Sequence, residues 1–320
     1  MTGSVASTGA TGFIGWHLCE AFRHAGWRVR AVVRPGNAKP TAAGVDVVQA
    51  ALESAGLARA IDGCQVLVHA AGVARARRAS QFDLINVSGT RAAVDAANDT
   101  RARLVYISSQ AAIGAGTIAR PAREDDVPRP LTAYGRSKVA AEAAVRSGAR
   151  VPWVILRPTS VYGPRDRQFL PLFRLASRGI LAQAIDAATP LTLIYVDDLT
   201  RAVVLASGDD RVLAQALFLG HPDPLSAGEL LQLLARTVDR RIRRLRIPRP
   251  VVGVAALAGE VSWLLGREPL VDLARYAELG AAGFVCSVDR ARELLGFTAT
   301  VPLEEGVLRT VRWYRQNGWI

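Results

Sequence analysis

The chain has 320 residues, of which 50% are hydrophobic and 21% are charged, so it is too apolar for a disordered protein. Its apolar runs are shorter than the roughly 20 residues of a membrane-spanning helix, and residues 1–15 do not have the pattern of a secretory leader. The net charge is +12, yet all but two of the 40 basic residues are arginines, mostly scattered through helical patterns. This bias is typical of a GC-rich coding background, and we expect no nucleic-acid partner.

Three cysteines are spaced too irregularly for a disulfide framework or a metal site. Cys19, Cys64 and Cys286 are far apart and odd in number. We therefore expect no structural disulfide, no bound metal and a reducing, cytoplasmic location.

Short apolar segments alternate with helical patterns through the first half of the chain. Strands that are apolar on both faces and separated by helices indicate a parallel sheet covered on both sides. The predicted fold class is therefore α/β, a doubly wound Rossmann-type sheet with right-handed crossovers. We predict strands at residues 4–7, 28–33, 45–49, 66–70, 103–108 and 153–157, and helices at 13–25, 54–61, 81–97 and 133–146.

The pattern changes after Gly163. We predict a helix at 169–178, strands at 191–196 and 216–219, a helix at 198–206, and mostly helices from 224 onward, with a basic strand-like segment at 241–247. Residues 1–162 and 190–220 would form the cofactor-binding domain, and residues 163–189 and 221–320 a smaller, mostly helical substrate lobe. This lobe would cap the carboxyl ends of the strands, where ligands of such sheets bind.

A glycine-rich segment follows the first predicted strand and opens the first predicted helix. In GATGFIG, Gly9 permits a tight turn, Gly12 lets the backbone approach a pyrophosphate, and Gly15 allows close packing of helix on strand. The N–H groups of the helix N-terminus would then bind the phosphates. Such a turn can also serve packing alone, but its position between a strand and a helix favours nucleotide binding.

Tyr134 and Lys138 lie four residues apart in a predicted helix, so both side chains project from one face. A neighbouring cation favours the phenolate, so we expect Lys138 to lower the pKa of Tyr134 and fit it for acid–base work near neutral pH. Lysine is rare in this arginine-rich chain, which favours a chemical role for Lys138. The same spacing also arises by chance on many helices.

A serine pair, Ser108 and Ser109, ends the predicted strand at 103–108 and would open onto the same crevice. A hydroxyl there can hydrogen-bond a substrate oxygen, although serine pairs also form turns and helix caps. The glycine turn, the strand-end serines and the Tyr/Lys pair follow one another in the order that a single site needs. Their co-occurrence favours the functional interpretation of all three.

Short motifs along nearly the whole chain resemble those of the extended short-chain dehydrogenase/reductases, within the NAD(P)-dependent epimerase/dehydratase superfamily. The resemblance implies Ser109, Tyr134 and Lys138 as catalytic residues, with Lys138 also holding the nicotinamide ribose. Ser109 is favoured over Ser108 because the family's catalytic serine directly precedes the stretch matching QAAIG. The motifs are TGATGFIG at 8–15, HAAG at 69–72, INVSGT at 85–90, YISSQAAIG at 106–114, YGRSK at 134–138, LRPTSVYGP at 156–164, YVDDL at 195–199 and LLGFTATVPLEEGV at 294–307.

The same resemblance implies a nucleotide cofactor that lies along the glycine turn and the ends of the neighbouring strands. We interpret His69 as a packed strand residue without an acid–base role, and expect Ser109 and Ser160 to contact the substrate. The expected cofactor contacts are Gly9, Thr11, Gly12, Phe13, Ile14, Gly15, Arg34, Ala70, Ala71, Gly72, Asn86, Tyr134, Lys138, Pro158 and Val161.

Two departures from the family's pattern bear on which cofactor binds. An acidic residue after the second strand would bind the adenosine ribose of NAD, whereas here Val33 is followed by Arg34. Because a guanidinium pairs well with a 2′-phosphate, we predict NADP(H) in preference to NAD(H), although Arg34 could instead stack on adenine or face solvent. The acidic residue usual after the third strand is replaced by Ala50 and Ala51, which leaves only backbone contacts to the adenine.

The substrate end of the chain departs from the nucleotide-sugar members of the family. Those members usually have an asparagine in the stretch matching RPTSVYGP, where this chain has Ser160, and the stretch is closer to the hydroxysteroid dehydrogenase and ketone reductase branch. Residues 247–270 also resemble that branch and place Val254, Leu257, Val261 and Leu264 on one helix face. That face would line a pocket or, more commonly, pack on the lobe core or a second subunit. An anionic membrane surface is a weaker alternative, because Glu260 interrupts the apolar stretch.

We therefore predict an NADP(H)-dependent oxidoreductase that interconverts a carbonyl and a secondary alcohol on a small, fairly apolar molecule. Tyr134 would act as acid/base, Ser109 would polarise the substrate oxygen and Lys138 would hold the ribose. Two alternatives stay open: a nucleotide-sugar epimerase or dehydratase with a recycled cofactor, and a non-catalytic NADP(H)-binding scaffold. The family resemblance implies a homodimer through the helices at 81–98 and 133–147.

Overall fold

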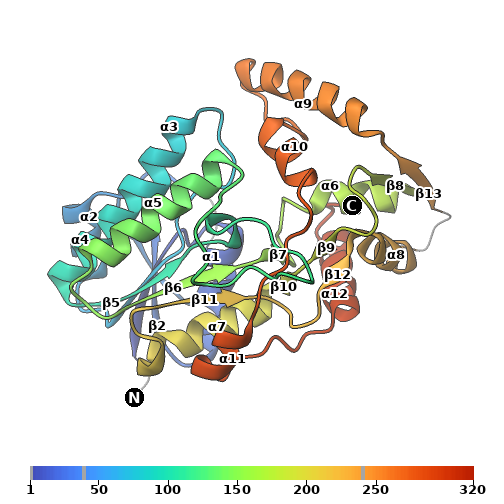
Figure 1. Cartoon of the computed structure of the whole chain (residues 1–320). Coiled ribbons are helices and arrows are strands. Elements are labelled where there is room, and N and C mark those ends of the chain that lie inside the picture. Colours follow the sequence, from blue (N-terminus) through green and yellow to red (C-terminus); the bar gives the residue numbers. More distant parts are fainter. Residues whose placement is uncertain (1–2, 38–40, 239–241) are drawn as a thin grey trace.

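A sheet of seven parallel strands forms the centre of the molecule (Figure 1). The computed structural model describes residues 3–37, 41–238 and 242–320. The strand order is β11-β6-β5-β4-β1-β2-β3 and every neighbouring pair is parallel, which confirms the predicted doubly wound α/β sheet. The strands are β1 (Ser4–Thr8), β2 (Arg28–Val33), β3 (Asp46–Gln49), β4 (Val66–His69), β5 (Arg103–Ile107), β6 (Trp153–Pro158) and β11 (Gln215–Leu219).

Two hydrophobic cores lie on opposite faces of the sheet, because neighbouring residues of a strand point to opposite sides. Val5 of β1 belongs to the core that contains Leu18, whereas Ala6 belongs to the core that contains Leu57 and Ala93. Helices α1 and α7 cover the first face, and α2, α4 and α5 cover the second (Figure 1). Their bounds are α1 (Phe13–His24), α2 (Ser54–Ile61), α4 (Gly89–Thr100), α5 (Ala133–Gly148) and α7 (Val196–Gly208).

Residues 81–97, predicted as one helix, belong to three consecutive helical segments: α3 (Ala79–Phe82), the π-helical turn η1 (Asp83–Ser88) and α4. Within η1 the side-chain Oδ1 of Asn86 accepts a hydrogen bond from the N–H of Val73 at 2.8 Å. A π-turn adds a single residue to a helix, so a pattern based on 3.6 residues per turn does not reveal it.

Beyond β6 the chain forms short two-stranded pairs. Residues 191–196 split into β9 (Pro190–Leu191) and β10 (Leu193–Tyr195), so the predicted continuous strand is wrong. Strand β10 pairs with β7 (Ser160–Tyr162), and β9 pairs with β12 (Leu225–Ser226). Segments this short carry too few residues for the alternation that marks a strand in a sequence.

The rest of the second half is mostly helical, as predicted. The basic segment predicted at 241–247 forms β13 (Arg243–Arg246), which pairs in parallel with β8 (Ile180–Gln183), and residue 241 lies outside the described residues. Figure 1 shows α9 and α10 at the outside of this region, away from the sheet. The helices are α6 (Leu170–Ser177), α8 (Ala227–Thr237), α9 (Arg249–Leu264), α10 (Leu273–Leu279), α11 (Asp289–Leu295) and α12 (Leu303–Gln316), with 3-10 turns η2 (Gln110–Ala112) and η3 (Asp210–Val212).

All three cysteines are buried and unpaired in the described part of the chain. Burial raises the pKa of the Cys19 thiol to about 12, and it also raises the pKa values of Cys64 and Cys286. Among the described residues, no group of three His, Cys, Asp or Glu side chains could hold a metal ion. In those residues, too, every helix is either too short or too polar to cross a bilayer.

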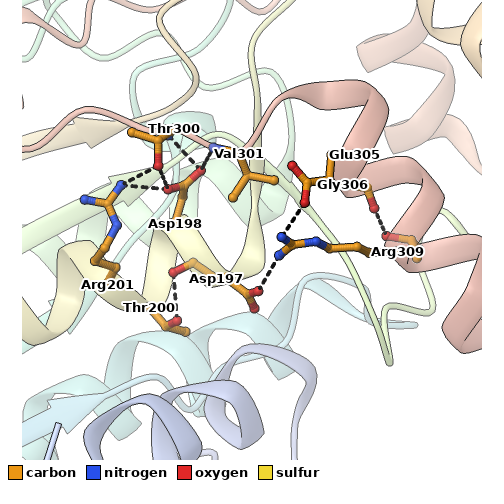
Figure 2. Close-up of polar contacts among 10 residues, drawn as sticks. Asp197, Asp198, Thr200, Arg201, Thr300, Val301, Glu305, Gly306 and Arg309 are labelled. Atoms are coloured by element: carbon orange, nitrogen blue, oxygen red, sulfur yellow. Dashed lines mark hydrogen bonds and ion pairs between the residues drawn. The ribbon is translucent and has the colours of Figure 1, made fainter. Parts of the chain in front are cut away.

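A buried carboxylate at the start of α7 ties the sheet to the C-terminal part of the chain (Figure 2). Asp198 is 2% exposed, and it accepts hydrogen bonds from the N–H groups of Thr300 at 3.0 Å and Val301 at 2.8 Å. The guanidinium of Arg201 pairs with the same carboxylate at 2.7 Å. These contacts fix the segment that leads into α12 against the end of the sheet.

Asp198→Ala is expected to lower the free energy of unfolding by about 2–4 kcal/mol, because two backbone N–H groups and a guanidinium lose their acceptor. The neighbouring Asp197 is half-exposed and pairs with Arg309 at 3.6 Å, so Asp197→Ala should cost less than about 1 kcal/mol. Urea unfolding of both variants measures the difference. Equal losses would show that the Asp198 contacts do not hold this junction.

Candidate active site

The glycine turn between β1 and α1 has the geometry of a phosphate-binding loop. Gly9 has φ +71°, and a Cβ there would lie 2.8–2.9 Å from the backbone of Ala70 and Ala71. A Cβ on Gly15 would overlap the carbonyl oxygen of Gly9, which also accepts a hydrogen bond from the Gly12 N–H at 2.8 Å. Only glycine fits these two positions, and the turn leaves an uncharged helix N-terminus that suits an anion.

The other residues predicted around this turn lie near it in the structure. The Thr11 hydroxyl accepts a hydrogen bond from Asn37 Nδ2 at 2.9 Å, and Phe13 and Ile14 form the first turn of α1. Arg34 directly follows β2, and its side chain is exposed. Ala50 is buried, and its N–H donates to the carbonyl of Val33 at 2.9 Å.

Asn86 connects the end of β4 to α5. The amide is 1% exposed, and its Nδ2 donates to the carbonyl of Val73 and to the hydroxyl of Ser137, both at 2.9 Å. A Cβ on Gly72 would lie 3.1 Å from Asn86 Oδ1 and 3.7 Å from Lys138 Nζ. Both donors of the amide are thus used within the protein, so the side chain positions the backbone after β4.

His69 is fully buried at the end of β4, as expected for a packed strand residue. Its Nδ1 lies 2.8 Å from the Thr8 hydroxyl, and its ring stacks on Tyr106 with 5.8 Å between centroids. Burial lowers the pKa of His69 to about 3, with a smaller contribution from the charge of Lys138. The imidazole is therefore neutral throughout the physiological range.

Ser109, Tyr134 and Lys138 come together at the carboxyl end of β5. Ser109 is the N-cap of η2, where its hydroxyl accepts a hydrogen bond from the Ala111 N–H at 3.2 Å, and it lies close enough to the phenol of Tyr134 to lower its pKa. Lys138 lies one turn further along α5, with Nζ 6.0 Å from the centre of the Tyr134 ring. The ammonium donates to the carbonyl of Ile107 at 2.9 Å. One hydroxyl, one phenol and one ammonium therefore lie near one another.

The neighbouring Ser108 takes part in a different contact. Its hydroxyl is buried and donates to Glu142 Oε1 at 2.6 Å. The same carboxylate accepts from Arg157 Nε at 2.9 Å and Nη2 at 2.6 Å. Sequence reasoning missed this buried ion pair, although an arginine inside the apolar strand at 153–158 signals the need for a partner.

The predicted lowering of the phenol's pKa is wrong for the protein without ligands. Burial raises the pKa of Tyr134 to about 12; the hydrogen bond with Ser109 lowers it and the charge of Glu278 raises it. The pKa of Lys138 falls to about 8, because burial disfavours the ammonium more than the nearby Glu142 favours it. Desolvation, which residue spacing does not reveal, thus outweighs the neighbouring charges.

A pocket of about 230 Å³ adjoins Tyr134 between α5 and the segment that contains α10. Residues 165–175 contribute three of its side chains, those of Arg167, Gln168 and Pro171. Among the described residues, the lining includes neither Ser109 nor Ser160. Ser160 is exposed at the start of β7, shortly after Pro158 at the end of β6, and the next residue, Val161, is partly buried. The lining consists of Ala74, Arg75, Ala76, Phe82, Thr132, Ala133, Tyr134, Arg167, Gln168, Pro171, Glu268, Leu270, Asp272, Ala274, Arg275 and Glu278.

Ion pairs join the two walls of this pocket. Arg75, which follows β4, pairs with Glu268 at 3.2 Å and with Asp272 at 3.0 Å. Within the wall that α10 forms, Arg275 pairs with Glu278 at 3.8 Å. Sequence reasoning missed these residues, because nothing in the periodicity of 268–278 indicates that this segment returns to the region after β4.

Comparison with known proteins bears on what this site does. Residues 6–215 match the model of the NAD dependent epimerase/dehydratase family. The chain is 32% identical over 323 residues to a ceramide reductase of Caulobacter vibrioides, and the match covers 99% of this chain and 96% of the relative. It is 31% identical over 317 residues to the 4-hydroxy-2-methyl-3-oxo-4-farnesyl-3,4-dihydroquinoline-1-oxide ketoreductase of Stigmatella aurantiaca, with 94% and 93% covered.

Among solved structures, MoeE5 in complex with UDP-glucuronic acid and NAD is similar over 98% of this chain and all of the other, with a TM-score of 0.79 and 26% identity. The family match covers the glycine turn and the sheet from within β1 to the first residue of β11, and both relatives match nearly the whole chain. The chain belongs to the NAD-dependent epimerase/dehydratase family and is an NAD(P)-dependent oxidoreductase of the extended short-chain dehydrogenase/reductase type.

Proposed function

We propose that the protein uses NADP(H) to interconvert a carbonyl and a secondary alcohol on a small, fairly apolar substrate. The observation that carries this proposal is the grouping of three side chains, in which the ammonium of Lys138 lies 6.0 Å from the centre of the Tyr134 ring and Ser109 lies near the phenol. Tyr134 lines the pocket, and Lys138 Nζ lies near Gly72, which follows β4. A scaffold that only held the nucleotide would not need these three groups together.

The ionisation states of the three groups suit carbonyl reduction. When bound, the nicotinamide would supply the hydride. With a pKa of about 12, Tyr134 is protonated at neutral pH and can donate its proton to the substrate oxygen. Ser109 can hydrogen-bond the same oxygen, and Lys138, with a pKa of about 8, is mostly charged and can donate to ribose hydroxyls. In oxidation the phenol would take part in the reverse proton transfer.

The residues present fit a dinucleotide with a 2′-phosphate. The turn at Gly9 and Gly15 has no room for a Cβ, and the uncharged start of α1 can accept a pyrophosphate. The exposed Arg34 directly after β2 stands where an acidic residue would otherwise bind the ribose of NAD. A guanidinium at that place favours NADP(H).

The names of two relatives support an apolar substrate. A ceramide reductase and a ketoreductase of a farnesyl-bearing quinoline both match this chain over more than nine-tenths of its length. Ceramide and a farnesyl chain are both lipid-like. Phe82, Pro171 and Leu270 give the pocket apolar surface beside Tyr134, on which such a substrate could lie.

A nucleotide-sugar epimerase is the second candidate function. MoeE5, which is similar over the whole chain, was solved with UDP-glucuronic acid and NAD. Arg167 and Arg275 line the pocket, and a guanidinium can bind a diphosphate. An epimerase recycles its cofactor, so it would retain the nucleotide during purification and show no net NADPH oxidation.

Tyr134→Phe is expected to lower kcat for NADPH oxidation with a long-chain ketone at least 100-fold, because the proton donor is lost. Cofactor affinity, measured by NADPH fluorescence, should change little. The matched control Tyr276→Phe removes a phenol of α10 outside the pocket lining and should retain activity. Wild-type kcat in Tyr134→Phe would refute the catalytic assignment. A nucleotide that stays bound to the wild-type protein through purification, with no NADPH oxidation when a ketone is added, would favour the epimerase.

Lys138→Met is expected to change how the free energy of unfolding depends on pH, because burying the ammonium costs free energy in the wild type. Between pH 8 and 10.5 the unfolded wild-type chain binds more protons at this lysine than the folded chain, so its stability rises with pH there. The variant lacks this rise, so its stability relative to wild type should fall by on the order of 3 kcal/mol across that window. Urea unfolding at several pH values tests this. A difference that does not vary with pH would mean that the ammonium is not desolvated.

Arg34→Asp is expected to raise the Kd of NADPH at least tenfold and to change that of NADH much less, because only NADPH carries the 2′-phosphate. Titrations monitored by cofactor fluorescence measure both affinities. Arg59→Asp makes the same charge change at an exposed position on α2 and serves as the control. An equal loss for both cofactors would remove the basis for preferring NADP(H).

A further inference from the structure

Helix α9 presents an apolar face to solvent. Val254, Leu257 and Leu264 are 68%, 60% and 68% exposed, and Val251, Val261 and Leu265 are also exposed. At 3.6 residues per turn, these six positions lie on one side of the helix. The expectation that this face packs on the lobe core is therefore wrong, and none of the six lines the pocket beside Tyr134.

The opposite side of α9 packs against α10 and the residues just before it. Val252, Ala256 and Gly259 are buried there, and a Cβ on Gly259 would overlap the carbonyl of Val271. Glu260 also faces this side, since its Oε1 accepts a hydrogen bond from the Leu273 N–H at 3.0 Å. The glutamate thus does not interrupt the outer face, which is apolar along its length.

Exposed arginines adjoin this apolar face. Strand β13 ends three residues before α9 begins, and the two elements lie next to each other in Figure 1. The side chains of Arg243, Arg244 and Arg246 are all exposed. Arg249 and Arg267 are exposed at the two ends of the helix, and Glu260 is the one acidic residue in the sequence from 242 to 267. The surface therefore combines a broad apolar face with an excess of positive over negative charge.

We propose that the outer face of α9, together with the arginines of β13, docks the protein on the surface of an anionic lipid bilayer. An amphipathic helix that lies in the headgroup region gains from buried apolar area and from attraction between arginines and anionic lipids. No described helix can span a bilayer, so the contact is peripheral. The segment after α9 carries Leu270 and Glu278 of the pocket wall, so docking would bring the pocket close to the lipid surface.

A second copy of this chain fits the surface less well. In a symmetric dimer the same patch meets itself, so the arginines of one copy would have to find acidic partners within the same patch of the other. The one glutamate of the patch already binds the backbone of α10 and cannot compensate them. Anionic headgroups supply the missing negative charge.

Co-sedimentation with vesicles tests this proposal without any turnover, so its result does not depend on whether the proposed reaction is correct. The full chain is mixed with vesicles of phosphatidylcholine, alone or with an equal part of phosphatidylglycerol, at low and high salt. We expect binding to the anionic vesicles that weakens as salt rises. Wild-type protein that remains in the supernatant at low salt would overturn the proposal, as would equal binding to both kinds of vesicle.

Matched variants identify the surface. Val254→Glu should lower the vesicle partition coefficient at least tenfold, whereas Val127→Glu, at a valine 75% exposed outside α9, should leave it unchanged. Replacing Arg243, Arg244 and Arg246 by Ser should lower it about 100-fold, at roughly fivefold for each arginine. Equal losses in Val254→Glu and Val127→Glu would overturn the proposal.

Sedimentation velocity in lipid-free buffer tests whether a second copy of this chain, and not a lipid surface, covers the outer face of α9. A dimer that Val254→Glu converts to monomers, with no vesicle binding by the wild type, would assign the face to a second copy. Circular dichroism of each variant shows whether it folds, and oxidation of NADPH with a water-soluble ketone should be the same in Val254→Glu as in wild type. A monomeric wild type that binds anionic vesicles supports docking.

Discussion

A buried ion pair between Glu142 and Arg157 fixes helix α5 to the sheet, and the geometry of the active site depends on it. Glu142 is 5% exposed, and its carboxylate is also bound by the hydroxyl of Ser108 at the end of β5. Lys138 and Tyr134 lie one and two turns earlier on the same helix, respectively. Two charges in the protein interior must satisfy each other, because an unpaired one costs several kcal/mol. The pair therefore leaves α5 little freedom to shift along the strand ends.

Desolvation determines the chemistry of the groups that α5 carries. The ion pair keeps the helix against the sheet, where the ammonium is buried and the phenol is partly buried. Burial favours the neutral form of both, so the pKa of Tyr134 rises and that of Lys138 falls. The two values move apart, so at neutral pH the phenol keeps its proton while the ammonium lies close to its own pKa.

Much of this protein follows from local sequence features. Glycines 9, 12 and 15 and the apolar strands predicted the sheet and its phosphate turn, because a left-handed φ and close backbone contacts demand particular residues. The spacing of Tyr134 and Lys138 predicted that they share a helix face. The π-turn, the pairing of β7 with β10 and the return of 268–278 to the pocket could not be predicted, since each arises from contacts distant in the sequence. Nor does an apolar helix pattern reveal whether its face is covered, as α9 illustrates.

The buried cysteines have a practical consequence. Each of the three native thiols is enclosed by the fold and has a raised pKa, so little thiolate forms at neutral pH to react with maleimides or iodoacetamide. A cysteine introduced at the surface would then be alkylated far faster than any native one. The folded protein can therefore carry a single fluorophore or crosslinker at a chosen position without prior removal of its own thiols.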